Sequence, residues 1–126
     1  MIREGLLVGS GGFIGAVTRY ALGGLVYSII RSPLLPWGTL AVNVLGCLAI
    51  GFCGGLADSR QLFSPDARLF LFIGIFGGFT TFSTFGYETF ALLRDGDTLR
   101  AILNILLQIG FGLGAVWAGD LLSHFA

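Results

Sequence analysis

The chain has 126 residues, of which 55% are hydrophobic and 11% are charged, and its formal net charge is zero. Because about a quarter of the residues in an ordinary soluble domain are charged, this composition excludes that class and favours a membrane protein. The chain has no lysine and no basic run, so nothing in it predicts binding to nucleic acid or to anionic lipid headgroups.

Four apolar segments follow one another along the chain, separated by short polar connections. Each exceeds the roughly 20 residues that a helix needs to cross about 30 Å of hydrocarbon. The first run is longer than the apolar part of a signal peptide, so we expect it to be retained as a membrane helix. The sequence therefore predicts a single all-α membrane domain over residues 1–126 with four transmembrane helices, at about residues 5–30, 37–57, 68–93 and 98–122.

Small residues recur at four-residue spacing, which lets helices in a membrane approach each other closely. The pairs are Gly5/Gly9, Gly11/Gly15, Gly51/Gly55 and Gly110/Gly114. Cys47 and Cys53 lie six residues apart in one apolar segment, a spacing that suits neither a metal site nor a disulfide along a helix. These small residues predict close helix packing and no particular function.

The arginines near the span ends are divided equally between the two sides of the membrane. Four spans place Arg3, Arg60 and Arg68 on one side, and Arg31, Arg94 and Arg100 on the other. The positive-inside rule then gives no preferred orientation, so we predict insertion in both orientations; the alternative is that the first span alone decides. Coexisting orientations favour an antiparallel homodimer with its two-fold axis in the membrane plane.

Polar side chains within the spans are costly in hydrocarbon unless they are paired or line water, so they are candidate functional residues. In the first span, Arg19 either extends to the membrane interface or stands in a water-filled vestibule that concentrates anions. Asn43 in the second span either donates to an anion or bonds a neighbouring helix, and the same alternatives apply to Asn104 and Gln108 in the fourth.

The third span contains the segment GGFTTFSTFGYETF, residues 77–90. Gly77-Gly78 followed by Thr80-Thr81 is poor helix-forming sequence and predicts a break near Gly77–Thr81. Carbonyls released by a break within the membrane need a partner, and two breaks facing each other across a two-fold axis would surround a small cation. The alternative is an unbroken helix whose hydroxyls bond its own carbonyls.

Two stripes follow the predicted break. Phe79, Phe82 and Phe85 recur every three residues, and Thr81, Thr84 and Glu88 form an adjoining polar stripe. Composition alone favours packing or lipid contact for the phenylalanines. The alternative is that their positive ring edges contact an anion.

These residues resemble a known family. The segment from Gly77 to Phe85, followed by Glu88, is similar to the signature of the Fluc (CrcB) fluoride channels. Gly38-Thr39-Leu40 before Asn43, the stretch from Gly15 to Arg19-Tyr20, and the four-span length support the resemblance, which covers essentially the whole chain.

The resemblance implies a passive, fluoride-selective channel that exports fluoride from the cytoplasm across the inner membrane, and not an enzyme. It also implies a dual-topology antiparallel homodimer with two pores and a central sodium ion. The backbone carbonyls of Gly77 and Thr80 from both subunits would hold the sodium. The fluoride pathway and its vestibule would involve Asn43 as donor, Phe82 and Phe85 as ring edges, and Thr39, Ser83, Thr84, Glu88, Asn104 and Arg19.

In the fourth span, Asn104, Gln108 and Gly112 stand where family members carry a tyrosine or other polar group and serines, although Asn104 can still donate. The alternative function is a proton-coupled small multidrug resistance exporter, which is also a four-span protein. Such an exporter needs a carboxylate deep in its first span. The nearest acid here is Glu4 at the very end of that span, so Glu88 would have to replace it.

Overall fold

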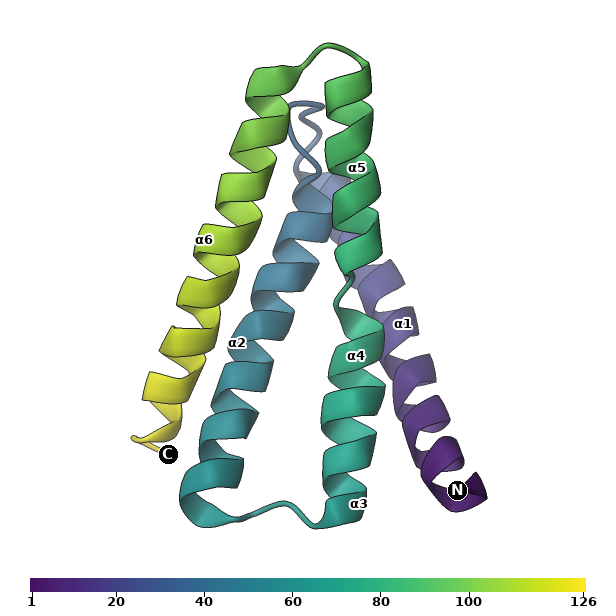
Figure 1. Ribbon diagram of the computed structural model, residues 1–126, viewed down its shortest axis with the longest axis vertical. Helices are drawn as coiled ribbons and strands as arrows, with labels where there is room; N and C mark the ends of the chain where they lie inside the picture. The colour runs from purple at the N-terminus through teal and green to yellow at the C-terminus, as the bar shows by residue number, and fades with distance from the viewer.

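The computed structural model describes all residues 1–126, and every regular element in it is helical (Figure 1). Three long helices are continuous, whereas the third of the four long segments is divided into four pieces. The elements in chain order are α1 Ile2–Ile29, α2 Trp37–Arg60, α3 Pro65–Arg68, the π-helix η1 Leu69–Phe76, α4 Gly77–Phe79, α5 Phe82–Arg94 and α6 Thr98–Ser123. The predicted helical segments are therefore confirmed, with ends that differ by a few residues.

The helices pack in two main pairs. α2 lies along α6, and α1 packs against η1 and α4, while α5 contacts α6. Both chain ends and the connection before α3 lie at one end of the molecule, and the other two connections lie at the opposite end (Figure 1). This arrangement is the one expected of a chain that crosses the same layer four times.

Three of the four long segments are long and apolar enough to cross a membrane by length and composition: Trp37–Arg60, Pro65–Arg94 and Thr98–Ser123. α1 is 28 residues long but is not among these three, and it carries Arg19 within its length. The membrane span over α1 therefore stays a prediction. Insertion in both orientations and the homodimer also stay predictions.

Glycine pairs explain the close approach of helices in both main pairs. A Cβ atom at Gly11 or Gly15 would collide with backbone carbonyls of η1, and one at Gly51 would collide with the Val116 carbonyl of α6. The other two predicted pairs, Gly5/Gly9 and Gly110/Gly114, have no neighbour within 4 Å. Two of the four glycine pairs thus mediate contacts within the chain, and two lie on open surfaces.

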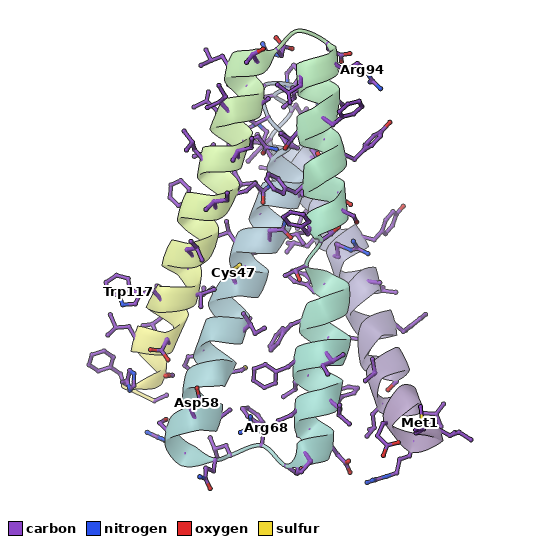
Figure 2. The ribbon with its side chains drawn as sticks, viewed as in Figure 1. Met1, Cys47, Asp58, Arg68, Arg94 and Trp117 are labelled. Carbon is purple, nitrogen blue, oxygen red and sulfur yellow. The ribbon has the colours of Figure 1, made fainter.

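The buried interior contains more polar than apolar side chains. Five polar residues are buried, and only four apolar ones: Thr39, Thr89, Asn104, Gln108 and Ser123 against Leu35, Val42, Ala57 and Ala101. Large apolar side chains instead point outward, as Figure 2 shows for Trp117 on α6. This distribution suits a chain whose outer surface is covered by lipid or by another subunit and whose interior carries polar groups.

Candidate ion pathway

The third segment is interrupted at Thr80 and Thr81, which have extended backbone angles of φ −82°, ψ 158° and φ −149°, ψ 111°. The break falls within the predicted region, but Gly77 and Gly78 are helical. The glycines are needed for packing instead, since a Cβ at Gly78 would lie 2.6 Å from the Gly12 carbonyl oxygen. Of the two weak helix-forming pairs in the predicted region, the threonines form the break and the glycines do not.

Both threonines stabilise the helix ends beside the break. Thr80 Oγ1 donates to the Phe76 carbonyl at 2.8 Å, and Thr81 Oγ1 accepts from the Thr84 N–H at 3.2 Å as the N-cap of α5. Such caps satisfy backbone groups that a helix end leaves without partners. The hydroxyls thus bond the local backbone, as the alternative interpretation proposed, but they do so at a break and not in an unbroken helix.

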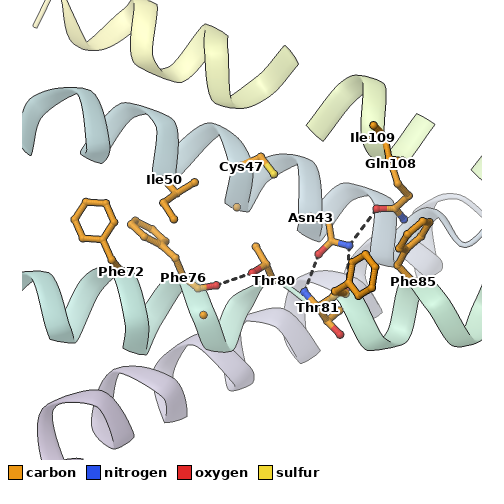
Figure 3. Close-up of a pocket in the computed structure, with 13 residues that line it drawn as sticks. Asn43, Cys47, Ile50, Phe72, Phe76, Thr80, Thr81, Phe85, Gln108 and Ile109 are labelled. Carbon is orange, nitrogen blue, oxygen red and sulfur yellow. Dashed lines mark hydrogen bonds between the residues drawn. The ribbon is translucent and has the colours of Figure 1, made fainter. Parts of the chain in front are cut away.

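Asn43 of α2 bonds the break directly (Figure 3). Its Oδ1 accepts from the Thr81 N–H at 2.8 Å, and its Nδ2 donates to the Thr81 carbonyl at 3.1 Å. Nδ2 also donates to Gln108 Oε1 of α6 at 3.1 Å. Both amide hydrogens of Asn43 are therefore bonded within the chain, and a single side chain joins α2, the break and α6.

A cavity of about 390 Å³ lies beside these bonds, and we call it the break cavity. Helix α2, the third segment and α6 all contribute to its wall (Figure 3). Its wall includes Asn43, Gly77, Thr80, Thr81, Phe82, Phe85 and Gln108. The structure thus brings together three predicted anion contacts, Asn43, Phe82 and Phe85, and both predicted cation contacts.

Gln108 and Thr81 are polar residues of this cavity that the predicted pathway omits, and Gln108 is the one on α6. Its side chain is buried, and its Nε2 has no hydrogen-bond partner. It lies one helical turn from Asn104 on the same buried face of α6, and that spacing is the sequence signal that pointed to it. Its bond to Asn43 depends on the packing of α6 against α2, which the sequence does not specify.

A second cavity, of about 420 Å³, also reaches the break, and we call it the arginine cavity. Arg19, Thr39 and Thr84 line it together with Thr81. Because Thr81 also lines the break cavity, one residue forms part of the wall of both. Arg19 makes no ion pair in the structure, which suits a fixed cation in an open vestibule.

Comparison with known proteins identifies the family. The family model described as "CrcB-like protein, Camphor Resistance (CrcB)" matches residues 6–120. The chain belongs to the CrcB family. It is 50% identical over 108 residues to the fluoride-specific ion channel FluC of Geobacter sulfurreducens, covering 86% of each chain. It is 46% identical over 123 residues to FluC of Chlorobaculum tepidum, covering 98% of this chain and 96% of that one.

Membership of the CrcB family confirms the resemblance found in the sequence. The chain is a multi-pass membrane protein of a fluoride channel family and not an enzyme. The exporter alternative is therefore wrong. Glu4, the acid nearest the first span, is exposed and forms an ion pair with the Met1 amino group.

Two phenylalanines of this CrcB chain meet at the break cavity. The Phe82 and Phe85 ring centroids are 5.5 Å apart, and the two ring planes meet at 65° in an edge-to-face arrangement. Phe79 is separated from them by the break and lies against Gly46 of α2. The predicted continuous stripe of three phenylalanines was therefore wrong, because the extended residues change the direction of the chain between Phe79 and Phe82.

The remaining predicted pathway residues lie along α5 and at its contact with α2. Thr39 is buried and donates to Glu88 Oε1 at 2.5 Å, so the carboxylate has a hydrogen-bond partner. Ser83 is exposed, with its Oγ 3.5 Å from Thr81 Oγ1. Neither Glu88 nor Ser83 lines the two cavities, and their part in the pathway stays a prediction.

Asn104 is buried between α6 and α5, away from both cavity walls. Its Nδ2 donates to Thr89 Oγ1 at 2.9 Å, and Thr89 Oγ1 donates to the Phe85 carbonyl at 2.8 Å. Its Oδ1 has no hydrogen-bond partner. Asn104 therefore joins α6 to the turn of α5 that carries Phe85, and its predicted contact with fluoride stays a prediction.

Proposed function

We propose that this chain conducts fluoride passively through a membrane, past Thr81 between the arginine cavity and the break cavity. The observation that carries the proposal is that two cavities lined by predicted pathway residues share Thr81, in a chain that is 41–50% identical to proteins named fluoride-specific ion channel. Arg19 would attract anions to the first cavity, and Phe82, Phe85 and amide groups would contact them in the second.

The chemistry of these groups suits a small, strongly hydrated anion. A channel must replace the water around the ion at several sites without holding the ion too tightly. Threonine hydroxyls, amide donors and ring edges are neutral and individually weak, whereas a lysine would hold the anion more strongly. Gln108 Nε2 is unpaired at the break cavity, and an anion there would compete with Gln108 Oε1 for a hydrogen of Asn43.

Passive conduction is sufficient for export. Moving one charge through 100 mV is worth about 2.3 kcal/mol, which corresponds to a concentration ratio of roughly fiftyfold. A membrane potential that is negative inside drives an anion outward. The channel therefore needs neither a proton gradient nor a nucleotide to lower the fluoride concentration in the cell.

We infer that the working channel is an antiparallel homodimer. Phe82, although it lines the break cavity, is 82% exposed on the single chain, so the cavity needs a further wall. The open glycine pairs Gly5/Gly9 and Gly110/Gly114 offer surfaces for close helix contact. The equal arginine counts on the two sides favour both orientations in one membrane.

The break also fits a sodium ion shared by two such chains. The Thr81 N–H, which would bond the Gly77 carbonyl in a continuous helix, donates to Asn43 instead. Gly77 is exposed on the single chain, so its carbonyl is accessible to a second subunit. Carbonyl oxygens of Gly77 and Thr80 from two chains are hard ligands of the kind that such a cation takes. Bound sodium would supply a fixed positive charge at the two-fold axis.

Reconstitution tests the proposed function. Liposomes containing the full chain and loaded with potassium fluoride are treated with a potassium ionophore, and fluoride release is followed with a fluoride electrode. We expect rapid fluoride release, and no chloride release from matched liposomes loaded with potassium chloride. Absence of fluoride release, or release that requires a proton gradient, would overturn the proposal.

A further inference from the structure

We propose that Asn43 and Gln108 form an amide clamp that holds the third segment open at Thr81. The amide clamp thereby keeps the Gly77 carbonyl free for the cation. The first half of this inference rests on geometry alone, and the second half rests on the sodium site of the proposed function. Neither amide would touch the cation, so both are positioning residues.

The hydrogen bonds on either side of the break show what the amide clamp prevents. In an α-helix each N–H bonds the carbonyl four residues earlier. The Thr80 N–H still follows this pattern and bonds the Phe76 carbonyl at 3.0 Å. The next bond in the series would join the Thr81 N–H to the Gly77 carbonyl. Asn43 Oδ1 accepts from that N–H at 2.8 Å instead. The helical series of bonds therefore ends at the Thr80 N–H, and the third segment stays broken at Thr81.

The orientations of both amides follow from one backbone group. A backbone N–H only donates, so the Asn43 atom that faces the Thr81 N–H is Oδ1. Nδ2 then faces the Thr81 carbonyl and Gln108, and Gln108 must present Oε1 to it. Gln108 is 8% exposed, so α6 holds this second amide within the chain and against the first.

Removing the amide clamp leaves the Thr81 N–H without an acceptor from α2. A backbone donor in a membrane interior must find another partner, and the nearest carbonyl in the helical series is that of Gly77. Forming that bond would join α4 to α5 and would use the oxygen that the cation needs. The amide clamp thus connects the packing of α2 and α6 to the availability of a carbonyl on the third segment.

Threonine NMR signals report the state of the break without any measurement of transport. The chain has seven threonines, of which only Thr80 and Thr81 lie outside helices. Solid-state NMR on the full chain in lipid vesicles, with ¹³C-labelled threonine, should show two signals with extended Cα and Cβ shifts. We expect Asn43→Leu and the smaller Asn43→Ala to move the Thr81 signal to helical shifts. Two extended signals in both variants would overturn the proposal.

Two matched variants separate the amide clamp from a general loss of polar contacts. Asn104→Leu removes an amide from the same face of α6, but that amide bonds Thr89 and not the break, so both extended signals should remain. Asn43→Asp keeps an acceptor for the Thr81 N–H and should also retain both signals. Loss of an extended signal in Asn104→Leu would show that the break responds to any change in the core, which contradicts a specific clamp.

Sodium-dependent stability tests the second half of the inference. We expect sodium, compared with N-methylglucamine, to raise the unfolding temperature of the wild-type protein in detergent and to have no effect on Asn43→Leu. Gln108→Met removes one neutral hydrogen bond to Asn43. We expect this variant to need about fivefold more sodium for the same rise in unfolding temperature. An unchanged sodium requirement in Gln108→Met would remove Gln108 from the clamp. No sodium effect on the wild type would refute the proposed sodium site, while the threonine signals would still decide whether the clamp exists.

Discussion

Polar side chains inside this chain are tolerated because nearly all of them have specific partners. Thr39 donates to Glu88, Asn104 donates to Thr89, and Asn43 uses both amide hydrogens. A polar group left unpaired in hydrocarbon costs several kcal/mol, so each pair removes a penalty in addition to joining two helices. Two buried atoms of α6 remain unpaired, Gln108 Nε2 and Asn104 Oδ1. Of these two residues, only Gln108 lines the break cavity.

The ring edge of Phe82 gives a prediction at the residue scale. Phe82→Ile keeps an apolar side chain but removes the aromatic edge, so we expect fluoride release from liposomes to slow by about tenfold with the dimer intact. Phe90→Ile serves as the control because Phe90 is an exposed phenylalanine of the same helix that lines neither cavity. Equal slowing in the two variants would contradict an anion contact at Phe82.

The bond between Thr39 and Glu88 gives a second prediction. Thr39→Val keeps the shape of the side chain but removes the donor to a half-buried carboxylate. We expect the free energy of unfolding to fall by about 2 kcal/mol, measured by denaturation in mixed detergent micelles. Thr39→Ser restores a hydroxyl and should recover most of the loss. If serine is no better than valine, packing and not the hydrogen bond accounts for the effect.

At the scale of elements, the third segment shows what the sequence can and cannot predict. Apolar runs bounded by Pro33, Pro36 and the Asp95-Gly96-Asp97 connection were enough to predict four helical segments with ends accurate to a few residues. The break was predicted from weak helix-forming residues, but its position depended on which groups find partners on neighbouring helices. Gly78 is held helical by packing against Gly12, and Thr81 is held extended by Asn43. Such long-range contacts leave no local signal.

The contact between α2 and α6 gives a prediction at this scale. A Cβ at Gly51 would collide with the Val116 carbonyl, so we expect Gly51→Ala to lower the free energy of unfolding by about 1–3 kcal/mol in mixed micelles. Gly54 of the same helix has only the Phe72 ring at 4.0 Å, and Gly54→Ala should be neutral or stabilising by up to about 1 kcal/mol. If both variants lose similar amounts of unfolding free energy, the glycines are needed for helix flexibility and not for close packing.

At the scale of the whole molecule, the single chain is incomplete as an enclosed pathway. It buries only 18 of 126 residues, and Phe82 at the break cavity is largely exposed. In the proposed antiparallel homodimer, the second copy covers this surface and the two breaks face each other. The sequence predicted this arrangement through balanced arginines, whereas the shape of the cavities depends on packing that only the structure gives.

Dual insertion is tested by locating the C-terminus. We expect a C-terminal tag to react with membrane-impermeant reagents on both faces of the membrane, because arginines do not favour either side. A variant with Ser59→Arg and Ser64→Arg adds positive charge at one end of the molecule and should place the tag on the cytoplasmic face only. A wild-type tag found on a single face would refute insertion in both orientations.

Because of the bonds between Asn43 and Thr81, we expect position 81 to tolerate more substitutions than position 43. The Thr81 groups that meet the amide belong to the backbone, so every residue except proline would supply the same N–H and carbonyl. Position 81 can therefore change among residues that cap α5, such as serine, asparagine and aspartate, without loss of these two bonds. At position 43 the contact consists entirely of side-chain atoms, and even aspartate would keep only the acceptor for the Thr81 N–H and not the donor to the Thr81 carbonyl. Among functional sequences we therefore expect fewer residue types at position 43, whose side chain holds the break, than at position 81, whose backbone forms it.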